Sequence, residues 1–340
     1  MTSPSPRQNP YPSWRFSAET IDCARHVTAV SEALEEAERY SAARVRQNGA
    51  NEDRTTGNMA IAVYEHDTSR ELDPQLHTHA VAANLTYDGA EGRWKALQAG
   101  GIYDRRAYIS EIYRNALARE VLRLGYAIES QRDGRGHDCG FEIAGLPGDL
   151  LRRFSQRSRQ RDEAAREFEV VHGRRPTDNE VAVLVRESRA DKLVEISTEE
   201  LRAHQRARLT PEDIELLGAC KFEQLTVGDG LVPPGSSLQH AQDQVFERVS
   251  VARDYEILTE ALRHGRGRVR HQELKGALLL RESLGEVLRD GAEVATHLPP
   301  LTRWRLGRQN GTKSNREIQS AALDTAPRPI LTRETGTDCY

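Results

Sequence analysis

The sequence predicts an α+β protein in which an antiparallel sheet is backed by helices. Two stretches, Gly57–Asp67 and Leu76–Asp88, alternate the character of their side chains with the period of two that strands show. A short polar loop joins them, and two strands joined in this way pair most simply as antiparallel neighbours. Stretches with helical spacing of apolar residues flank the two strands on both sides, and they supply the helical layer.

The first half of the chain divides into recognisable elements. Residues 1–19 are rich in proline and small polar residues, so we expect them to be disordered. Apolar residues spaced by three and four predict a helix from about Thr20 to Asn48-Gly49, where glycine suits a left-handed cap. After the two strands, residues 93–101 predict a short edge element. An amphipathic helix is expected over Arg105–Tyr126, and a turn-rich hairpin over residues 126–144.

The second half is more polar and more helical. We take residues 20–165 as the main α+β domain and residues 166–235 as a charged helical extension that ends in the linker Leu225–Ser237. A short helical segment is predicted over residues 236–291. Residues 292–340 show no sustained period and are expected to form a disordered tail.

Composition excludes several classes of protein. The net charge of −4 gives no overall attraction to nucleic acid, so such binding would need local basic patches. Two exist, at Arg152–Arg161 and Arg263–His271, and each is equally compatible with a solvated surface. The chain has neither an apolar run of about 20 residues nor the centre of a secretory signal, which favours a cytoplasmic protein without a membrane partner. The cysteines lie far apart and form no CxxC pair: Cys23, Cys139, Cys220 and Cys339.

Two histidines close to a turn are the candidate functional residues. His77 and His79 lie on one side of a predicted strand, about 6–7 Å apart along it. His66 ends the preceding strand, and an antiparallel turn would return the chain beside it. Three neutral imidazoles with open positions are typical of a Lewis-acid metal site. The alternative is that these are ordinary side chains, because a lone His-x-His is a weak signal.

Residues 66–88 resemble the histidine motif of the MobF-class conjugative relaxases, the TrwC- and TraI-like HUH endonucleases. The resemblance extends to the strand before this motif, to the segment after it and to a Phe-Ser-x-Arg helix. Ser237–Gly267 is similar to the segment that joins the relaxase and helicase parts of such proteins. The similar stretches in the main domain are Arg54–Glu71, Gly92–Glu129 and Leu151–Ala164.

The resemblance implies a DNA-cleaving chemistry. In this family three histidines hold a divalent metal ion, and His66, His77 and His79 match them. The ion could be Mg, Mn, Zn or Ni, with imidazole softness favouring zinc, nickel, manganese or cobalt over magnesium. The expected substrate is single-stranded DNA at an origin of transfer. A tyrosine would nick it at a specific site on one strand and form a 5′-phosphotyrosine intermediate.

The sequence departs from the family pattern at the nucleophile. We find no paired-tyrosine motif, and the family's acidic helper residue falls on Ser13. Tyr11 is the one substitute that could reach the site. Gly307–Ser314 is not a P-loop, because Thr312 interrupts it and no strand precedes it. We therefore expect a relaxase truncated at both ends, which would nick DNA either together with a separately encoded N-terminal piece or through Tyr11. The alternatives are a catalytically inactive remnant that binds metal and single-stranded DNA, and a decayed product without activity.

Overall fold

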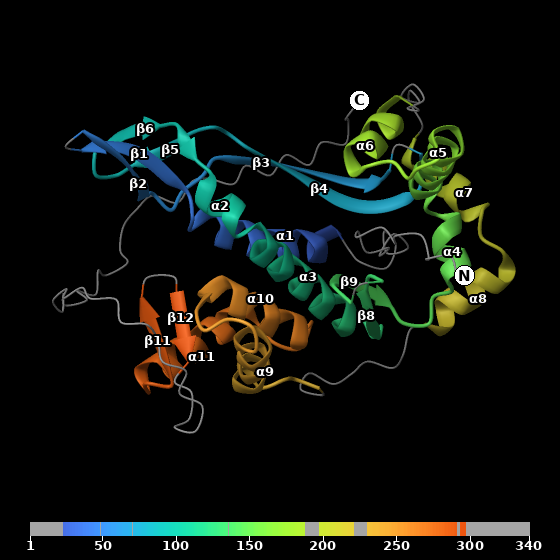
Figure 1. Ribbon diagram of the computed structural model, residues 1–340. Coiled ribbons are helices and arrows are strands. Elements are labelled where there is room, and N and C mark those ends of the chain that lie inside the picture. Colours follow the sequence, from blue (N-terminus) through green and yellow to red (C-terminus); the bar gives the residue numbers. More distant parts are fainter. Residues whose placement is uncertain are drawn as a thin grey trace.

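All strand pairs in the described residues are antiparallel, which confirms the predicted α+β class (Figure 1). The computed structural model describes residues 23–47, 49–69, 71–134, 136–187, 197–220, 230–290 and 293–296. The disorder predicted for residues 1–19, and for the tail beyond Thr296, concerns residues outside these ranges. Among the described residues, no helix is long and apolar enough to cross a bilayer.

The first half of the chain contains a bundle of hairpins and two long helices. Its elements are α1 (Cys23–Glu38), β1 (Ala42–Gln47), β2 (Ala50–Thr55), β3 (Ile61–Thr68), β4 (Pro74–Ala82), β5 (Thr86–Asp88), β6 (Arg93–Lys95), β7 (Leu97–Gln98), α2 (Gly100–Asp104), α3 (Arg106–Arg123), β8 (Ile128–Arg132) and β9 (Asp138–Ile143). The strands form the separate sheets β2-β1-β7, β3-β4, β5-β6 and β8-β9. The predicted hairpin near residues 126–144 and the short edge element are both present.

The prediction that the first helix continues to Asn48-Gly49 is wrong. The helix ends at Glu38, and β1 and β2 follow as a hairpin whose turn contains Gly49 at φ +83°. In β1 the buried residues Ala43 and Val45 alternate with exposed arginines, which is the pattern of a strand. Asn-Gly between two such stretches is a strong hairpin signal, and it outweighs the helix-cap interpretation.

The predicted strand Leu76–Asp88 is divided into two strands. β4 ends at Ala82, and β5 begins at Thr86 and pairs with β6 instead of continuing along β3. The Leu85 amide donates to the Ala83 carbonyl at 2.7 Å, so the chain turns tightly between the two strands. A sequence pattern of period two continues through this turn, and for that reason the break was not foreseen.

The helix α3 lies between two hydrophobic clusters. One cluster packs it against α1, β4 and the β8–β9 hairpin, through Ala29, Leu76, Leu117, Val121 and Phe141. The other cluster packs the opposite side of α3 against helices from the end of the described chain. Its largest fully buried members are Tyr108, Ile112, Leu238, Ile257, Leu262 and Leu274. The same helix therefore supports the β3–β4 hairpin and anchors a second group of helices.

The second half of the chain is mainly helical. Its elements are α4 (Gly148–Arg153), α5 (Gln156–His172), α6 (Asp178–Glu187), α7 (Thr198–Arg206), α8 (Pro211–Ala219), α9 (Pro234–Phe246), β10 (Ala252–Arg253), α10 (Asp254–His264), α11 (His271–Ser283), β11 (Val287–Asp290) and β12 (Glu293–Thr296). We refer to the described residues from 230 to 296 as the C-terminal helical unit.

The C-terminal helical unit has more structure than predicted. Three helices and a three-stranded sheet in the order β10-β12-β11 replace the expected short helical segment. The strand β12 lies beyond Ala292, where we expected little order. It pairs with both β10 and β11. These strands contain two to four residues each, too few for a period to be recognised.

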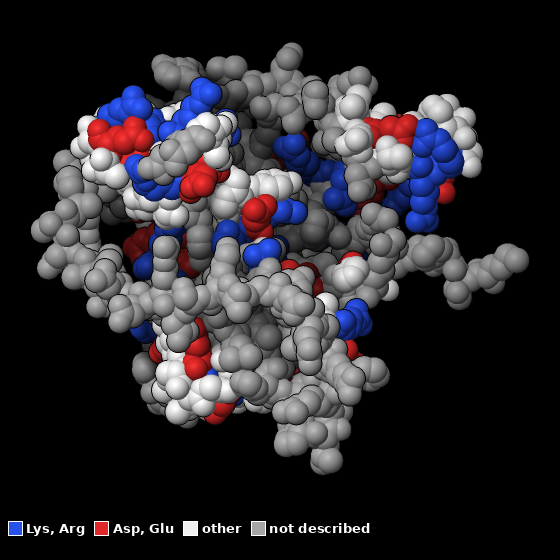
Figure 2. All heavy atoms as spheres, turned by 60° about the vertical axis from the view of Figure 1, so that its left-hand side comes forward, with Lys and Arg blue, Asp and Glu red and all other residues white. Residues whose placement is uncertain are grey.

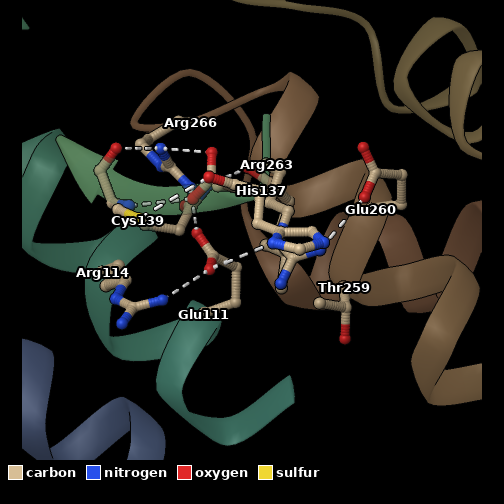
Figure 3. A network of polar contacts seen from close by, with 12 residues as sticks. Glu111, Arg114, His137, Cys139, Thr259, Glu260, Arg263 and Arg266 are labelled. Atoms are coloured by element: carbon tan, nitrogen blue, oxygen red, sulfur yellow. Dashed lines mark hydrogen bonds and ion pairs between the residues drawn. The ribbon is translucent and has the colours of Figure 1, made fainter. Parts of the chain in front are cut away.

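A buried ionic network fastens this unit to the rest of the fold (Figure 3). Arg266, which follows α10 and is 5% exposed, donates to Glu111 of α3 at 2.5 Å and to both carboxylate oxygens of Asp138 on β9. Nearby, the Asn115 amide of α3 donates to the Leu262 carbonyl at 3.2 Å. Three segments that are distant in the sequence are thus joined by charge-assisted hydrogen bonds, which are stronger than neutral ones.

Candidate functional site

The β3–β4 hairpin presents the three histidines on one face. His66 lies directly opposite His77, and Tyr64 lies directly opposite His79. Residues paired in this way point to the same side of an antiparallel ladder, as do residues two apart on one strand. Tyr64, His66, His77 and His79 therefore share one face, as the sequence predicted for the three histidines.

The opposite face of β4 is fixed by the helices beneath it. Leu76 is 1% exposed and packs in the cluster around α1 and α3. The Thr78 hydroxyl lies 2.9 Å from Nε2 of His26, a buried residue of α1, and the Tyr113 hydroxyl lies 3.4 Å from the other ring nitrogen of His26. Burial, with a smaller contribution from His77, lowers the pKa of His26 to about 4. These contacts hold the histidine face outward.

The three imidazole rings form a nearly equilateral triangle. Their centroids are 5.2 Å apart for His66 and His77, 5.1 Å for His66 and His79, and 5.1 Å for His77 and His79. Three imidazoles bound at about 2.1 Å to one tetrahedral ion have ring centres roughly 5 Å apart. The spacing of the rings thus matches that of a three-histidine site.

The ring orientations are not those of a closed site. His66 and His77 are nearly parallel, at 24°, whereas His79 is close to perpendicular to both, at 76° and 80°. Within the ranges that the structure describes, no group of three or more His, Cys, Asp and Glu side chains meets the geometry of a metal site as it stands. Rotation about the soft terminal torsion of a histidine changes where its nitrogens point without moving the backbone.

One histidine has its tautomer set by the backbone. Nδ1 of His77 lies 2.9 Å from the Gln75 carbonyl oxygen. A carbonyl only accepts, so Nδ1 carries the hydrogen and Nε2 retains its lone pair. A hydrogen bond of this kind orients a metal-binding imidazole and increases its basicity. His66 and His77 are half-buried and His79 is exposed, so the face is open to a large ligand.

The described tyrosines near the site differ in accessibility. Tyr64, on the histidine face, is 48% exposed, so it lines the site and is not a core residue. Tyr108 is 1% exposed, and burial raises its pKa well above the ordinary value. Burial also raises the pKa of Tyr113. Both are packing residues of α3. Tyr11 and Ser13 lie outside the described residues.

Some arginines of the two predicted basic patches form ion pairs within the fold. In the second patch, Arg266 belongs to the buried network and Arg263 pairs with Glu260 at 3.2 Å. In the first patch, Arg153 pairs with Asp213, and Arg161 pairs with Asp162. These four arginines are engaged in the fold, whereas Arg152, Arg157 and Arg159 of the first patch are exposed.

A different basic surface lies on β1, β2 and β6. An open groove of about 720 Å³ there is lined by Arg44, Arg46, Asn51, Glu91, Arg93, Lys95, Ala96 and Gln98. Lys95 and Arg93 are neutralised by Glu91, at 2.5 and 2.7 Å. Figure 2 turns this end of the molecule toward the viewer, and positive and negative side chains are interspersed over its described part. The alternation Arg-Val-Arg along β1 was the available signal for the groove.

Comparison with known proteins identifies the family. The family described as TrwC relaxase matches residues 14–211, which is more than half of the chain. The chain belongs to the TrwC relaxase family. The multifunctional conjugation protein TraI of Escherichia coli K12 is 35% identical over 151 residues, which cover 42% of this chain and 8% of TraI. This chain therefore corresponds to a small part of that relative.

Solved structures of TrwC share the fold. The metal-free complex of the conjugative relaxase TrwC with oriT DNA is 32% identical, with a TM-score of 0.51 over 58% of this chain and 67% of that chain. The metal-bound complex is also 32% identical, with a TM-score of 0.50 over 58% of this chain and 66% of that chain. At this identity the similarity extends to the family as well as to the fold.

Several residues around the histidine face were not singled out from the sequence. His26 and Thr78 are 52 residues apart and meet only because α1 packs under β4. Asp73 directly precedes β4, and its partners come from α5 and from Arg208. No local pattern signals a contact over 135 residues. Such residues are found only when the packing of the helices is known.

Proposed function

We propose that this chain is a relaxase domain that binds single-stranded DNA at an origin of transfer, with His66, His77 and His79 holding a divalent metal ion. The observation that carries the proposal is the triangle of imidazole rings, with sides of 5.1–5.2 Å, on an open face of the β3–β4 hairpin. Support comes from the relative TrwC, which is described both in complex with oriT DNA and in a metal-bound form.

Different side chains on the histidine face would have different roles in binding the metal ion and the DNA. His77 offers Nε2, because its Nδ1 hydrogen is used by the Gln75 carbonyl. His79 faces solvent, where a phosphate group can approach. A divalent ion held there would polarise a phosphate oxygen of the DNA backbone as a Lewis acid. Tyr64, exposed on the same face, offers an aromatic surface for a base.

A second candidate function is binding of metal and single-stranded DNA without cleavage by this chain alone. Burial raises the pKa of both tyrosines of α3, Tyr108 and Tyr113, which is unfavourable for a nucleophile. Tyr64 is accessible, but it is held in the middle of a paired strand. Among the described residues, the histidine face thus offers three candidate metal ligands without an activated tyrosine beside them.

Calorimetric titration tests the metal site. The chain is titrated separately with Mg²⁺, Mn²⁺, Zn²⁺ and Ni²⁺, and we expect one stoichiometric site for at least one of these ions. The double variant His77→Ala/His79→Ala should lose that site. The control His137→Ala, an exposed histidine on the β8–β9 turn, should keep it. Absence of a stoichiometric site in the unmodified chain would refute the metal role of the three histidines.

A DNA experiment then separates the two candidates. The metal-loaded chain is incubated with a labelled origin-of-transfer oligonucleotide and examined for a covalent adduct on a denaturing gel. An adduct that disappears in His77→Ala/His79→Ala supports the nicking enzyme. Binding that weakens with salt, without an adduct under any of the four metals, supports the second candidate.

A further inference from the structure

The turn that joins the two histidine strands has a strained and heavily bonded backbone. Leu72 adopts φ +61°, a left-handed conformation that is uncommon for a residue with a branched side chain. The Asp73 amide donates to the Ser69 hydroxyl at 3.1 Å, and the Ser69 amide donates to the Asp73 carbonyl at 2.9 Å. Such strain persists only where surrounding contacts over-determine the conformation.

Those contacts converge on the Asp73 carboxylate, which is fully buried. One oxygen accepts from the backbone amide of Gln156 at 2.8 Å, at the first residue of α5. The other accepts from the Gln156 side-chain amide at 3.1 Å and from the Arg208 guanidinium at 2.9 Å. Ser155, at the N-cap of α5, makes no side-chain cap. Asp73 therefore caps α5 from another part of the chain, where a negative charge is stabilised by the helix N-terminus.

The partner arginine is itself fixed in place. Arg208 lies between α7 and α8, donates to the Arg153 carbonyl at 2.6 Å and stacks over the Phe154 ring at 4.4 Å. The Gln205 side chain donates to the Leu72 carbonyl at 2.9 Å, and the Gln156 side chain donates to the Glu71 carbonyl at 3.1 Å. The turn is thus held from two sides, by Gln156 of α5 and by Gln205 and Arg208 at the end of α7.

The turn is close enough to the histidines to set their relative position. Thr68 pairs with Pro74, His66 pairs with His77, and the ladder has an irregularity between His66 and Thr68. A shift of the turn therefore acts first on the alignment of His66 with His77. The remaining length of β4 is fixed from beneath through Leu76 and Thr78.

We infer that Asp73 is a positioning residue of the histidine site, which ties the β3–β4 turn to α5 and Arg208 so that His66 stays aligned with His77 and His79. This inference rests on the proposed metal role of these histidines. It assigns to the start of α5 and to the segment between α7 and α8 a function beyond packing, since Gln156 and Arg208 both act on the site through one carboxylate.

Metal affinity measured on the full chain tests the inference. Ni²⁺ is titrated calorimetrically into the unmodified chain and into Asp73→Asn, which keeps the shape of the side chain and removes its charge. Residues that support metal ligands typically change affinity by about 10- to 100-fold when altered, so we expect the dissociation constant of Asp73→Asn to rise by about 10-fold or more. Arg208→Met should raise it by a smaller factor, because Gln156 still binds Asp73.

A matched control separates positioning from general loss of stability. Asp88 is also buried and ion-paired, with Arg54 and Lys95 both at 3.0 Å, but it lies on β5. Asp88→Asn should lower the urea midpoint of unfolding while leaving the Ni²⁺ dissociation constant within about twofold of the unmodified value.

The outcomes are distinct. If the unmodified chain binds none of Mg²⁺, Mn²⁺, Zn²⁺ and Ni²⁺, the proposed metal function itself fails. If it binds, and folded Asp73→Asn binds equally well, the positioning role of Asp73 is overturned. Equal weakening in Asp73→Asn and Asp88→Asn also overturns it, because the effect would then be one of stability alone. Should Asp73→Asn not fold, Arg208→Met decides by the same comparison with Asp88→Asn.

Discussion

The β3–β4 hairpin and the C-terminal helical unit are attached to the same helix, α3, in different ways. The hairpin is a two-stranded ribbon with much of one face exposed, including Tyr64 and Val81. Its attachment depends on a few buried residues beneath β4 and on polar contacts at its turn. The C-terminal helical unit instead shares a continuous hydrophobic cluster with α3 and adds a buried ionic network.

This difference is the one expected if the hairpin has the proposed binding role and the helical unit does not. A two-stranded hairpin is marginally stable by itself, so it needs support from outside. A face that is to receive DNA and metal, as we propose for the hairpin, must remain accessible, which excludes covering it with apolar side chains. The helical unit carries no such requirement and is free to bury its residues. Stability should therefore respond to changes in the helical unit, and ligand binding to changes in the hairpin.

The largest effect on stability is expected from Arg266→Met. The guanidinium compensates the buried carboxylates of Glu111 and Asp138, at 2.5 and 2.7 Å. Removing one partner of a buried ion pair typically costs about 3–5 kcal/mol, because the remaining charges are left unpaired. Urea unfolding measures the loss.

An exposed ion pair provides the control for this variant. Arg174→Met breaks a pair with Glu180 in which the arginine side chain is 53% exposed, and exposed pairs contribute only about 0–1 kcal/mol. A loss below about 1 kcal/mol in Arg266→Met as well would mean that the buried network is dispensable for docking the C-terminal helical unit.

The contrast between the hairpin and the helical unit also explains which contacts could be predicted from the sequence. The pairing of His66 with His77 depends on period-two strands and a short turn, which are local features, and it was foreseen. The network of Arg266 was not, because the chain Arg263–His271 has the composition of a solvated basic patch. Glu111 and Asp138, which neutralise it, are 155 and 128 residues away from Arg266. Local pattern determines elements, whereas burial of a charge depends on contacts that no local pattern reveals.

A pair of glycines tests how closely the helical unit fits α3. Gly267 has φ +72°, and a Cβ there would lie 2.7 Å from Leu122 Cδ1 and 3.0 Å from the Ala118 backbone carbon. Left-handed strain of about 1–2 kcal/mol and overpacking of about 1–3 kcal/mol add, so Gly267→Ala should lose about 2–5 kcal/mol of stability. Gly276, inside α11, has nothing within 4 Å, and Gly276→Ala should gain about 0.5–1 kcal/mol. Thermal unfolding of both variants measures these changes. A melting temperature of Gly267→Ala equal to that of the unmodified chain would contradict the close fit.

Acid should loosen the helical unit through His271. This residue begins α11, is 6% exposed and lies 3.8 Å from Glu32 and 4.0 Å from Glu36. Burial lowers its pKa to about 4 despite those carboxylates. The unfolded chain then binds a proton more readily than the folded one. The stability contributed by neutral His271 is complete above about pH 6.5 and declines as the pH falls toward 4.

The expected loss for His271 is on the order of 3 kcal/mol across this window, since each pKa unit corresponds to about 1.4 kcal/mol. Urea midpoints measured at several pH values should fall less steeply in His271→Gln than in the unmodified chain. His204→Gln, which changes an exposed residue of α7, should leave the slope unchanged. Some slope should remain in His271→Gln, because burial also lowers the pKa of His26 to about 4. Identical slopes for the two variants would exclude His271 as a source of acid sensitivity.

The smallest effect on stability, and the clearest effect on binding, is expected at Tyr64. Its side chain is 48% exposed, so Tyr64→Ala should change the free energy of unfolding by no more than about 0.5 kcal/mol. If a base stacks on the ring, the same variant should weaken binding of a single-stranded oligonucleotide by about 1–3 kcal/mol. Tyr64→Phe keeps the ring and should bind nearly as well as the unmodified chain, as fluorescence anisotropy would show.

Tyr103→Ala alters a more exposed tyrosine on α2, at 66%, away from the histidine face, and should leave binding unchanged. Equal weakening at both tyrosines would mean that DNA contacts are spread over exposed aromatic residues and are not concentrated on the hairpin.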